Sequence, residues 1–461
     1  KVRSDGRRDP VLLTQSQNVK EKGVFTYPIW NEAGDKIVFI SGDEGSYKES
    51  YGPYAFKSSD KLMWISSNGG KLNYIDDSKG RSYPHFVKGE DRIYLYSSRN
   101  GLVSIKWDGT DEKKIVKVTG ITTYSSKTPS TASVVMISPN GKEGLAKVSN
   151  NIYSFTIPYT GKESLKIALA NPKSSSFPAK KLTKIGGEFP SWNDESNTIH
   201  WSLGSSFFSY NLRDSDKFDD EMEEKKKEEE KDEEEEKDEE EEKDEEEEKD
   251  EEEFLADELE VIVELNRDIP ESSILLKNAK IITMNEDEII ENGQIYIVNN
   301  RIKEVSENQI NIDESTEVID LNGKTILPGF VDTHAHMRPS WGLQKNQPFS
   351  YAANLAYGVT TTRDPQTGTT DVLTYSDMVD TGKILGPRVY STGPGVGYWG
   401  YNFKSLDEAK DALKQYSKYY NTKTIKMYRA GNRQQRQWIL IAAKEQNIMP
   451  TTEGALDLRL N

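Results

Sequence analysis

The sequence predicts a multidomain chain: an all-β N-terminal part, a small β-sandwich, and then an α/β part. Three observations predict this order. Short alternating strands recur with a spacing of about 50 residues up to position 215, an acidic run fills residues 219–253, and strands alternate with helices from residue 326 onward. Repeats of that length are typical of propellers and arrays, and strand–helix alternation favours parallel β/α units.

The N-terminal part, residues 1–215, contains four loose repeats. Each begins with an aromatic or apolar entry, at Trp30, Phe86, Ile137 and Trp192, and the spacing between these heads is nearly constant. A polar turn and an alternating strand follow each head, as hairpins require. Four short strands per repeat indicate a partial β-propeller over residues 1–215. A β-sandwich is the alternative, because spacing alone does not separate the two folds.

The acidic run accounts for the charge of the whole chain. Residues 219–253 hold 27 acidic residues and 7 lysines, a net charge of −20, whereas the full chain carries −17. Such a run cannot bury a core, so we expect residues 216–258 to be an acidic low-complexity linker or loop insertion. An exposed helix is the alternative, because Glu233 precedes Lys237 by one helical turn. The remainder is nearly neutral, which argues against a nucleic-acid partner.

Composition narrows the remaining classes. The chain has no cysteine, which excludes disulfides, thiolate metal ligands and cysteine nucleophiles. No apolar run reaches about 18 residues, so no membrane span is expected. The chain begins at Lys1 rather than Met, and we interpret it as a fragment. Export to the periplasm or the medium, with the signal lost by truncation, therefore stays open.

Short β-rich segments return over residues 259–330, the first of them at Val261–Val263. Their assignment to part of a β-sandwich is implied by the family resemblance given below. The alternation of strands and helices over residues 331–461 predicts β/α units. The predicted strands lie near 327–334, 358–363, 387–392, 423–428 and 447–452. The predicted helices lie near 348–357, 371–382, 405–420 and 432–446. Ser405 and Glu408 form a fair capping box at the start of the third helix.

A histidine pair ends the first of these strands. The stretch Ile326–His336 is an apolar run that closes with His334 and His336, spaced i, i+2. Residues with this spacing on a strand point to the same face. Two imidazoles side by side can bind one metal ion. The alternative is a pair of structural histidines.

The residues around the pair resemble a known family. The flank Pro328–Thr333, the segment Gly358–Gly368 and the segment Tyr390–Val396 are similar to the amidohydrolase superfamily, in the branch that carries a TolB-like β-propeller ahead of the hydrolase domain. The resemblance implies that residues 331–461 are the first five β/α units of a TIM-like (β/α)₈ barrel. It also implies that propeller blades and three barrel units are missing.

The resemblance further implies a site at the C-terminal ends of the barrel strands. The implied metal ligands are His334, His336, Lys426 as a carboxylated bridging lysine, and Glu453 where many relatives carry a histidine. An ordinary strand lysine and a substrate-orienting glutamate are the alternatives for the last two. The family's general-base aspartate is expected beyond residue 461, so no catalytic residue is assigned.

Arginines near the strand ends are the candidates for binding substrate. Arg363 and Asp364 follow the second strand, and Arg429 follows the fourth. An arginine can hold a substrate carboxylate by a bidentate contact. A structural ion pair with Asp364 is the alternative for Arg363, and a surface position is the alternative for Arg429.

The implied function is hydrolysis of non-peptide, amide-type carbon–nitrogen bonds by a water activated on one or two divalent ions, with zinc expected. The expected substrate is a small molecule or is peptide-like. Because the base is absent, we expect residues 1–461 to be inactive alone. The alternative is a propeller-based module that binds peptides or proteins, with an inactive barrel remnant.

Overall fold

The computed structural model describes residues 7, 9, 11–14, 23–43, 60–123, 126–157, 165–236, 253–337, 345–367, 371–397, 401–428 and 430–452. It divides into two compact units, which are described separately. One comprises residues 1–262 and 395–461, and the other comprises residues 263–394. No helix in the described part is long and apolar enough to cross a membrane.

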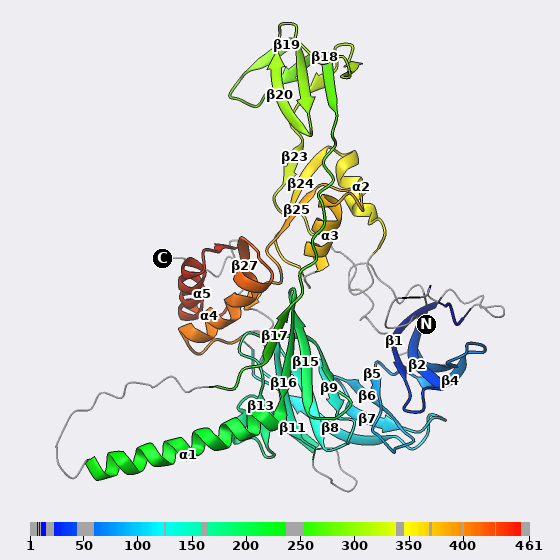
Figure 1. Ribbon diagram of the computed structural model, residues 1–461, viewed down its shortest axis with the longest axis vertical. Helices are drawn as coiled ribbons and strands as arrows, with labels where there is room; N and C mark the ends of the chain where they lie inside the picture. Colours follow the sequence, from blue (N-terminus) through cyan, green and yellow to red (C-terminus); the bar gives the residue numbers. More distant parts are fainter. Residues whose placement is uncertain are drawn as a thin grey trace. The chain divides into compact units, whose positions relative to one another are not determined.

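Four antiparallel sheets follow one another along the first unit, up to residue 262 (Figure 1). The first sheet has the order β1-β2-β3-β4: Gly23–Trp30, Lys36–Asp43, Lys61–Ser66 and Asn73–Asp77. The second has β5-β6-β7-β8: Ser82–His85, Ile93–Ser97, Gly101–Ile105 and Lys113–Thr119. A fifth strand, β12 (Leu165–Ala168), pairs with β8 in parallel.

The third and fourth sheets have the same up-and-down order. The third is β9-β10-β11-β13: Val134–Ile137, Glu143–Val148, Asn151–Thr156 and Ala179–Lys181. The fourth is β14-β15-β16-β17: Glu188–Trp192, Thr198–Leu203, Ser206–Asn211 and Asp257–Glu260. A 3-10 turn, Pro172–Ser174, precedes β13.

Consecutive sheets pack on each other through apolar side chains. One core cluster joins the first and second sheets and contains Leu62 and Val103, and another joins the second and third and contains Leu102 and Ala146. Burial of aliphatic side chains of this kind contributes roughly 1.5–3 kcal/mol each. Over the described residues the sheets do not close into a ring, so the TolB-like propeller stays a prediction.

A β-bulge at an aromatic-proline pair recurs in three of the four repeats. Tyr27, Tyr83 and Phe189 each precede a proline and adopt a φ of 52°, 54° and 54°. At each point the pairing with the next strand shifts its register. A bulge of this kind bends the first strand of a sheet. The aromatic-proline pair is therefore the local sequence signal for a bulge in the first strand of these repeats.

Glycine is required where the second sheet turns from β6 to β7. Gly101 has a φ of +81°, and a Cβ there would collide with the carbonyl oxygen of Val116. We expect Gly101→Ala to lower the free energy of unfolding by about 3 kcal/mol, because strain and collision add. Gly34, at a φ of +69° with no atom near its Cβ position, is the matched control. Gly34→Ala should cost only about 1 kcal/mol. Equal losses in urea denaturation would contradict this prediction.

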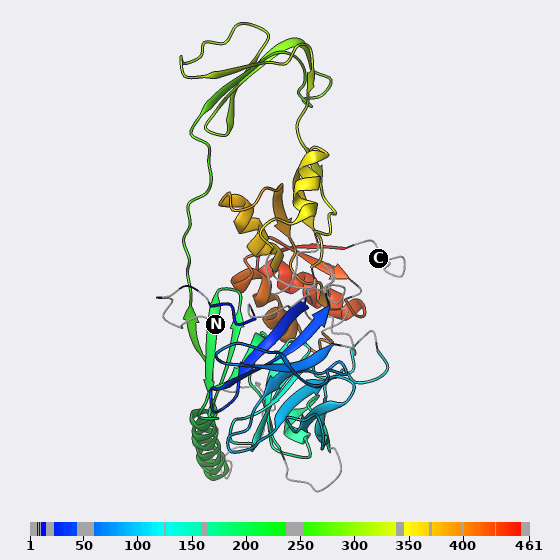
Figure 2. The same ribbon diagram turned by 90° about the vertical axis from the view of Figure 1, so that its right-hand side faces the viewer.

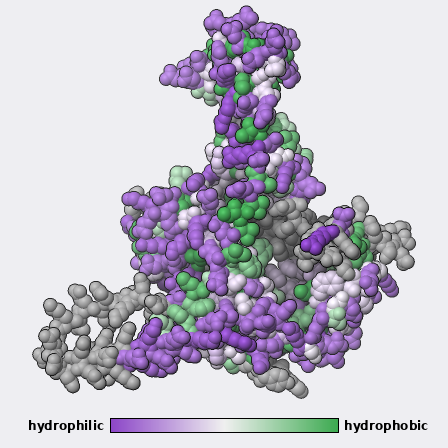
Figure 3. All heavy atoms as spheres, in the orientation of Figure 1, coloured by the Kyte–Doolittle hydropathy of each residue, from purple (hydrophilic) through white to green (hydrophobic). Residues whose placement is uncertain are grey.

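The acidic run begins as a helix. α1 spans Leu212–Glu236 and carries no basic residue in its last turn. The part of α1 that Figure 3 colours is largely hydrophilic. Because β16 precedes α1 and β17 follows the run, the acidic segment is an insertion inside the fourth sheet. The fold thus places the linker expected at 216–258 within a sheet, and residues 257–260 belong to that sheet rather than to the sandwich.

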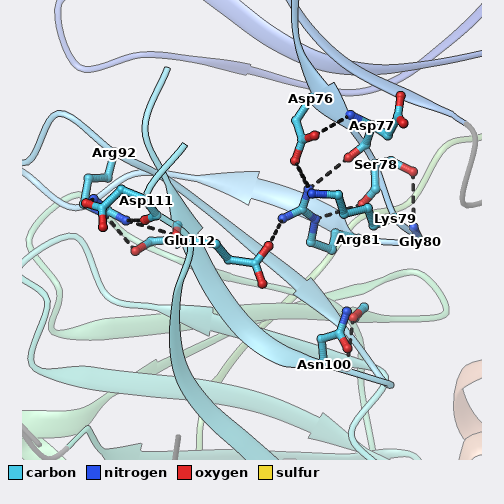
Figure 4. Close-up of polar contacts among 12 residues, drawn as sticks. Asp76, Asp77, Ser78, Lys79, Gly80, Arg81, Arg92, Asn100, Asp111 and Glu112 are labelled. Carbon is cyan, nitrogen blue, oxygen red and sulfur yellow. Dashed lines mark hydrogen bonds and ion pairs between the residues drawn. The ribbon is translucent and has the colours of Figure 1, made fainter. Parts of the chain in front are cut away.

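A buried arginine ties the first sheet to the second (Figure 4). The Arg81 guanidinium is 1% exposed and donates to Asp76 at 2.7 Å and to Glu112 at 2.9 Å. It also donates to the carbonyl oxygens of Ser78 and Asp77, each at 2.9 Å. A buried guanidinium persists only when its donors are satisfied in this way.

Residues 261–272, most of which belong to the second unit, form no helix or strand and are drawn as an extended trace in Figure 2. The strand suggested by Val261–Val263 is therefore absent. A sheet follows in the order β20-β19-β18-β21, with β22 pairing in parallel with β18. Its strands are β18 Ser273–Ile282, β19 Ile289–Val298, β20 Arg301–Ser306, β21 Glu317–Asp320 and β22 Thr325–Ile326.

Parallel β/α structure occurs in both units. The second unit holds β23 Phe330–Asp332, α2 Phe349–Ala356, β24 Val359–Asp364, α3 Asp371–Asp380 and β25 Arg388–Ser391. The first unit holds β26 Val396–Gly397, α4 Leu406–Lys414, a π-helix Gln415–Tyr419, β27 Thr424–Tyr428, α5 Arg433–Glu445 and β28 Met449–Thr451. The elements match the expected order, but they form two three-stranded sheets, and the partial TIM-like barrel stays a prediction.

Candidate functional site

The two faces of the β23-β24-β25 sheet differ in burial. Helices α2 and α3 supply Tyr351 and Tyr375 to a core cluster that includes Ala335, Met337 and Val389. On the adjacent strand Asp364 is also buried. Tyr390 alternates with Val389 and is exposed. The face away from the helices is therefore the accessible one.

His334 and His336 lie just beyond β23. The strand ends at Asp332, so both histidines are in the following turn and not on the strand that was expected to continue to residue 334. The Asp332 carboxylate accepts from the His334 backbone N–H at 3.0 Å. An aspartate that bonds two residues onward favours a turn over a continued strand. The strand was therefore predicted too long.

The turn nevertheless brings the two imidazoles together. Their ring centroids are 5.3 Å apart and their planes meet at 82°. Ala335, between them, and Met337, after them, are buried against the helices, while the His336 side chain remains 40% exposed. The pair is thus accessible and adjacent.

Asp364 lies beneath this turn at the end of β24. Its side chain is 2% exposed, and one carboxylate oxygen is 3.5 Å from His336 Nδ1. It accepts from the backbone N–H of Met337 at 2.9 Å and of Gln366 at 3.1 Å. Burial raises the pKa of Asp364, whereas the two backbone donors and His336 favour its charged form.

Arg363 is adjacent to Asp364 and half-buried. Its strand pairs in register with β25, so that Arg363 lies opposite Tyr390. Burial lowers the pKa of the Arg363 guanidinium, and the charge of Asp364 opposes that shift. Its position next to an exposed strand residue keeps Arg363 a candidate for contacting substrate.

The other candidates lie in the other compact unit or outside the described residues. Lys426 is on β27, 2% exposed, and belongs to the other compact unit, so its role as a bridging ligand remains a separate prediction. Glu453 and Arg429 lie outside the described residues. Among the described residues, no group of three or more His, Cys, Asp or Glu side chains could hold a metal ion.

The donor set fits part of a metal site. Two imidazole nitrogens are ligands that zinc and related divalent ions accept, and a nearby buried carboxylate is the usual partner of a metal-bound histidine. A complete ligand set is not present among the described residues. His334 and His336 therefore supply two nitrogen donors, and Asp364 supplies one supporting carboxylate.

The two remaining histidines have structural contacts. The buried His85 accepts from the Ile137 N–H at Nε2, so its Nδ1 carries the proton and donates to the Tyr83 carbonyl at 2.7 Å. His200 contacts the Ser209 hydroxyl at 3.0 Å and stacks on Phe207. Neither is near another histidine in sequence.

A pH dependence of stability follows from His85. Burial lowers its pKa to about 4, against 6.5 when unfolded. The unfolded chain therefore binds more protons between these values, so the stabilising contribution is full above pH 6.5 and is lost as pH falls toward 4. The expected loss is about 3 kcal/mol. Urea denaturation from neutral pH down to that pKa measures it, and His85→Gln should flatten the profile. An unchanged slope in that variant would refute the assignment.

Known proteins are similar to only part of this chain. No family model matches it. A stretch of 62 residues is 50% identical to 5-methylthioadenosine/S-adenosylhomocysteine deaminase of Bacillus thuringiensis (strain Al Hakam), covering 13% of this chain and 14% of that protein. The same enzyme of Bacillus cereus (strain AH820) matches with the same figures. The match thus spans about a seventh of these relatives' own length.

Solved structures with partial similarity include hydrolases. A Xaa-Pro dipeptidase with bound methionine has a TM-score of 0.33 at 20% identity, over 39% of this chain and 56% of that chain. An amidohydrolase has a TM-score of 0.33 at 18% identity, over 39% and 56%. The curated relatives are named as deaminases.

Proposed function

We propose that this chain is part of a metal-dependent hydrolase that acts on non-peptide carbon–nitrogen bonds. The observation that carries the proposal is the adjacent, accessible pair His334 and His336, with rings 5.3 Å apart at the C-terminal end of a parallel strand. The end of a parallel strand is where enzymes of this architecture place their chemistry. The 62-residue match to a deaminase supports the same class of reaction.

The residues of the chain would act in the following way. His334 and His336 would hold a divalent ion, with zinc the best fit to two imidazoles. When bound, such an ion polarises the substrate and lowers the pKa of a coordinated water to about 7. Arg363 would orient an anionic group of the substrate. The proposed further ligands are Lys426 and Glu453, and Arg429 is a second proposed contact to substrate.

The substrate class proposed is a small molecule with an amide, amidine or peptide-like carbon–nitrogen bond. No general base is assigned among residues 1–461. The test is zinc binding by the purified chain of residues 1–461, followed by a screen of the full-length protein for ammonia or amine release. Failure to bind zinc more tightly than a chain without the histidine pair would overturn the proposal.

The alternative is a binding module built on the four sheets, with an inactive α/β remnant. The observation in its favour is that the described residues contain no group of three metal-binding side chains. Zinc binding that depends on the histidine pair, without any hydrolysis by the full-length protein, would favour this alternative.

A further inference from the structure

The structure assigns to Asp364 the role of a positioning residue that fixes the proton of His336 on Nδ1 and leaves Nε2 free to bind a ligand. This inference rests on the proposed function for its purpose, but its geometry is independent of any bound ion. It is carried by two backbone anchors around His336 and by the contact between the carboxylate and the ring.

The backbone on both sides of His336 is bound to the end of β24. The N–H of Ala335 donates to the carbonyl oxygen of Arg363 at 3.0 Å. The N–H of Met337 donates to the Asp364 carboxylate at 2.9 Å. His336 is therefore held between two anchors on neighbouring residues of one strand, so the turn cannot move away from Asp364 without losing both bonds.

The same carboxylate faces the ring. Asp364 Oδ2 accepts from Met337, while Oδ1 accepts from Gln366 at 3.1 Å and is 3.5 Å from His336 Nδ1. That separation is longer than an ordinary N–H···O hydrogen bond, so the carboxylate acts on the ring as a nearby negative charge. A carboxylate oxygen accepts and cannot donate, so the neutral imidazole is favoured with its proton on Nδ1. Nε2 then carries the lone pair that a metal ion requires.

The burial of Asp364 explains why this one residue both anchors the turn backbone and contacts the His336 ring. At 2% exposure the carboxylate must satisfy its oxygens within the protein. Two backbone N–H groups and one imidazole provide three polar partners. The contact to His336 is thus part of the network that keeps the buried charge acceptable, which couples the direction of the ring to the fold of the turn.

Asp364→Asn tests the inference at nearly constant volume. An asparagine has one acceptor oxygen and one NH₂ donor, so it cannot accept from all three partners. With the amide oxygen accepting from Met337, the amide nitrogen faces the ring and the His336 proton should move to Nε2. Asp364→Ala, which removes both oxygens, keeps the test decisive if the amide turns the other way. Asp377→Asn is the control, because it makes the same change at an exposed carboxylate on α3 in the same compact unit.

The measurement is the tautomer of His336 by long-range ¹H–¹⁵N correlation in the ¹⁵N-histidine-labelled chain of residues 1–461 at mildly alkaline pH, without metal. The chain has 4 histidines, so single His→Gln variants assign every signal. We expect Nδ1–H in the wild type and in Asp377→Asn, and a shift toward Nε2–H in Asp364→Asn. Zinc affinity should fall about 10–100-fold in Asp364→Asn only.

The outcomes separate this inference from the proposed function. An Nε2–H tautomer in the wild type, or an unchanged tautomer in Asp364→Asn, overturns the positioning role regardless of zinc. Nδ1–H in the wild type that shifts in the variant supports the role even if the chain binds no zinc, a result that would overturn the proposed function alone. A purely structural Asp364 would lower stability without moving the tautomer.

Discussion

Replacing His334 and His336 together by alanine is expected to weaken zinc binding by more than about 100-fold, because both nitrogen donors are lost. Loss of a residue that only orients a ligand typically costs about 10–100-fold, so the double variant should exceed Asp364→Asn. The two rings are accessible and lie outside the core cluster that buries Ala335 and Met337. The fold should therefore tolerate the change. Zinc titration against a competing chelator measures the affinity.

The control for this prediction is His200→Gln, which removes a histidine from the fourth sheet. The acidic run of residues 219–253 would bind divalent ions weakly in every variant, so the chelator must be chosen to count only tight sites. His200→Gln should bind zinc like the wild type. Equal affinity in the double variant would show that the pair is structural, and the hydrolase proposal would fail.

Replacing Arg81 by methionine is expected to lower the free energy of unfolding of the first unit by about 3–5 kcal/mol. Removing one partner from a buried ion pair leaves the other uncompensated, and that is the costly case. Here Asp76 and two carbonyl oxygens would lose the guanidinium that satisfies them (Figure 4). Urea denaturation followed by tryptophan fluorescence reports the change, since Trp64 and Trp107 pack against the core that joins these two sheets.

Lys79→Met is the matched control, because Lys79 pairs with the same Asp76 carboxylate at 2.9 Å. Its side chain is 51% exposed, and exposed pairs contribute about 0–1 kcal/mol. The two variants remove one positive charge each from one carboxylate, so a difference between them isolates the effect of burial. Similar losses for both would contradict the assignment of Arg81 as a buried structural ion.

Local sequence was a good guide where the pattern is set by neighbouring residues. The alternation of apolar residues placed β24, α2, α3, β27 and α5 close to their observed bounds. The Ser405 cap was also foreseen, and the Ser405 hydroxyl does accept from the Glu408 N–H. The Glu408 carboxylate accepts from the Lys404 N–H instead of that of Ser405, so the predicted capping box is only half formed. A complete capping box, formed by Asn432 and Gln435 at the start of α5, was missed although its residues are readable in the sequence.

Prediction failed where a distant contact or a side-chain bond overrides the pattern. The strand before the histidines ends early because Asp332 bonds to the His334 backbone. The acidic run was expected to be a linker or a loop insertion, and only the pairing of β17 with β16 across it shows that it is an insertion. No local signal marks that pairing, because the residues of β17 are all exposed and mostly acidic. Their partner strand lies on the far side of the whole acidic run.

The sequence by itself determined which side chains are available: two neighbouring histidines, a strand-end aspartate, no cysteine, and four strand-rich repeats. It did so because residue type and short-range spacing are local properties. Only the tertiary structure decided that Asp364 lies under His336 and that Arg81 is satisfied by two sheets. Those arrangements depend on which distant backbone segments pair, and pairing is decided by burial and by the satisfaction of polar groups throughout the fold.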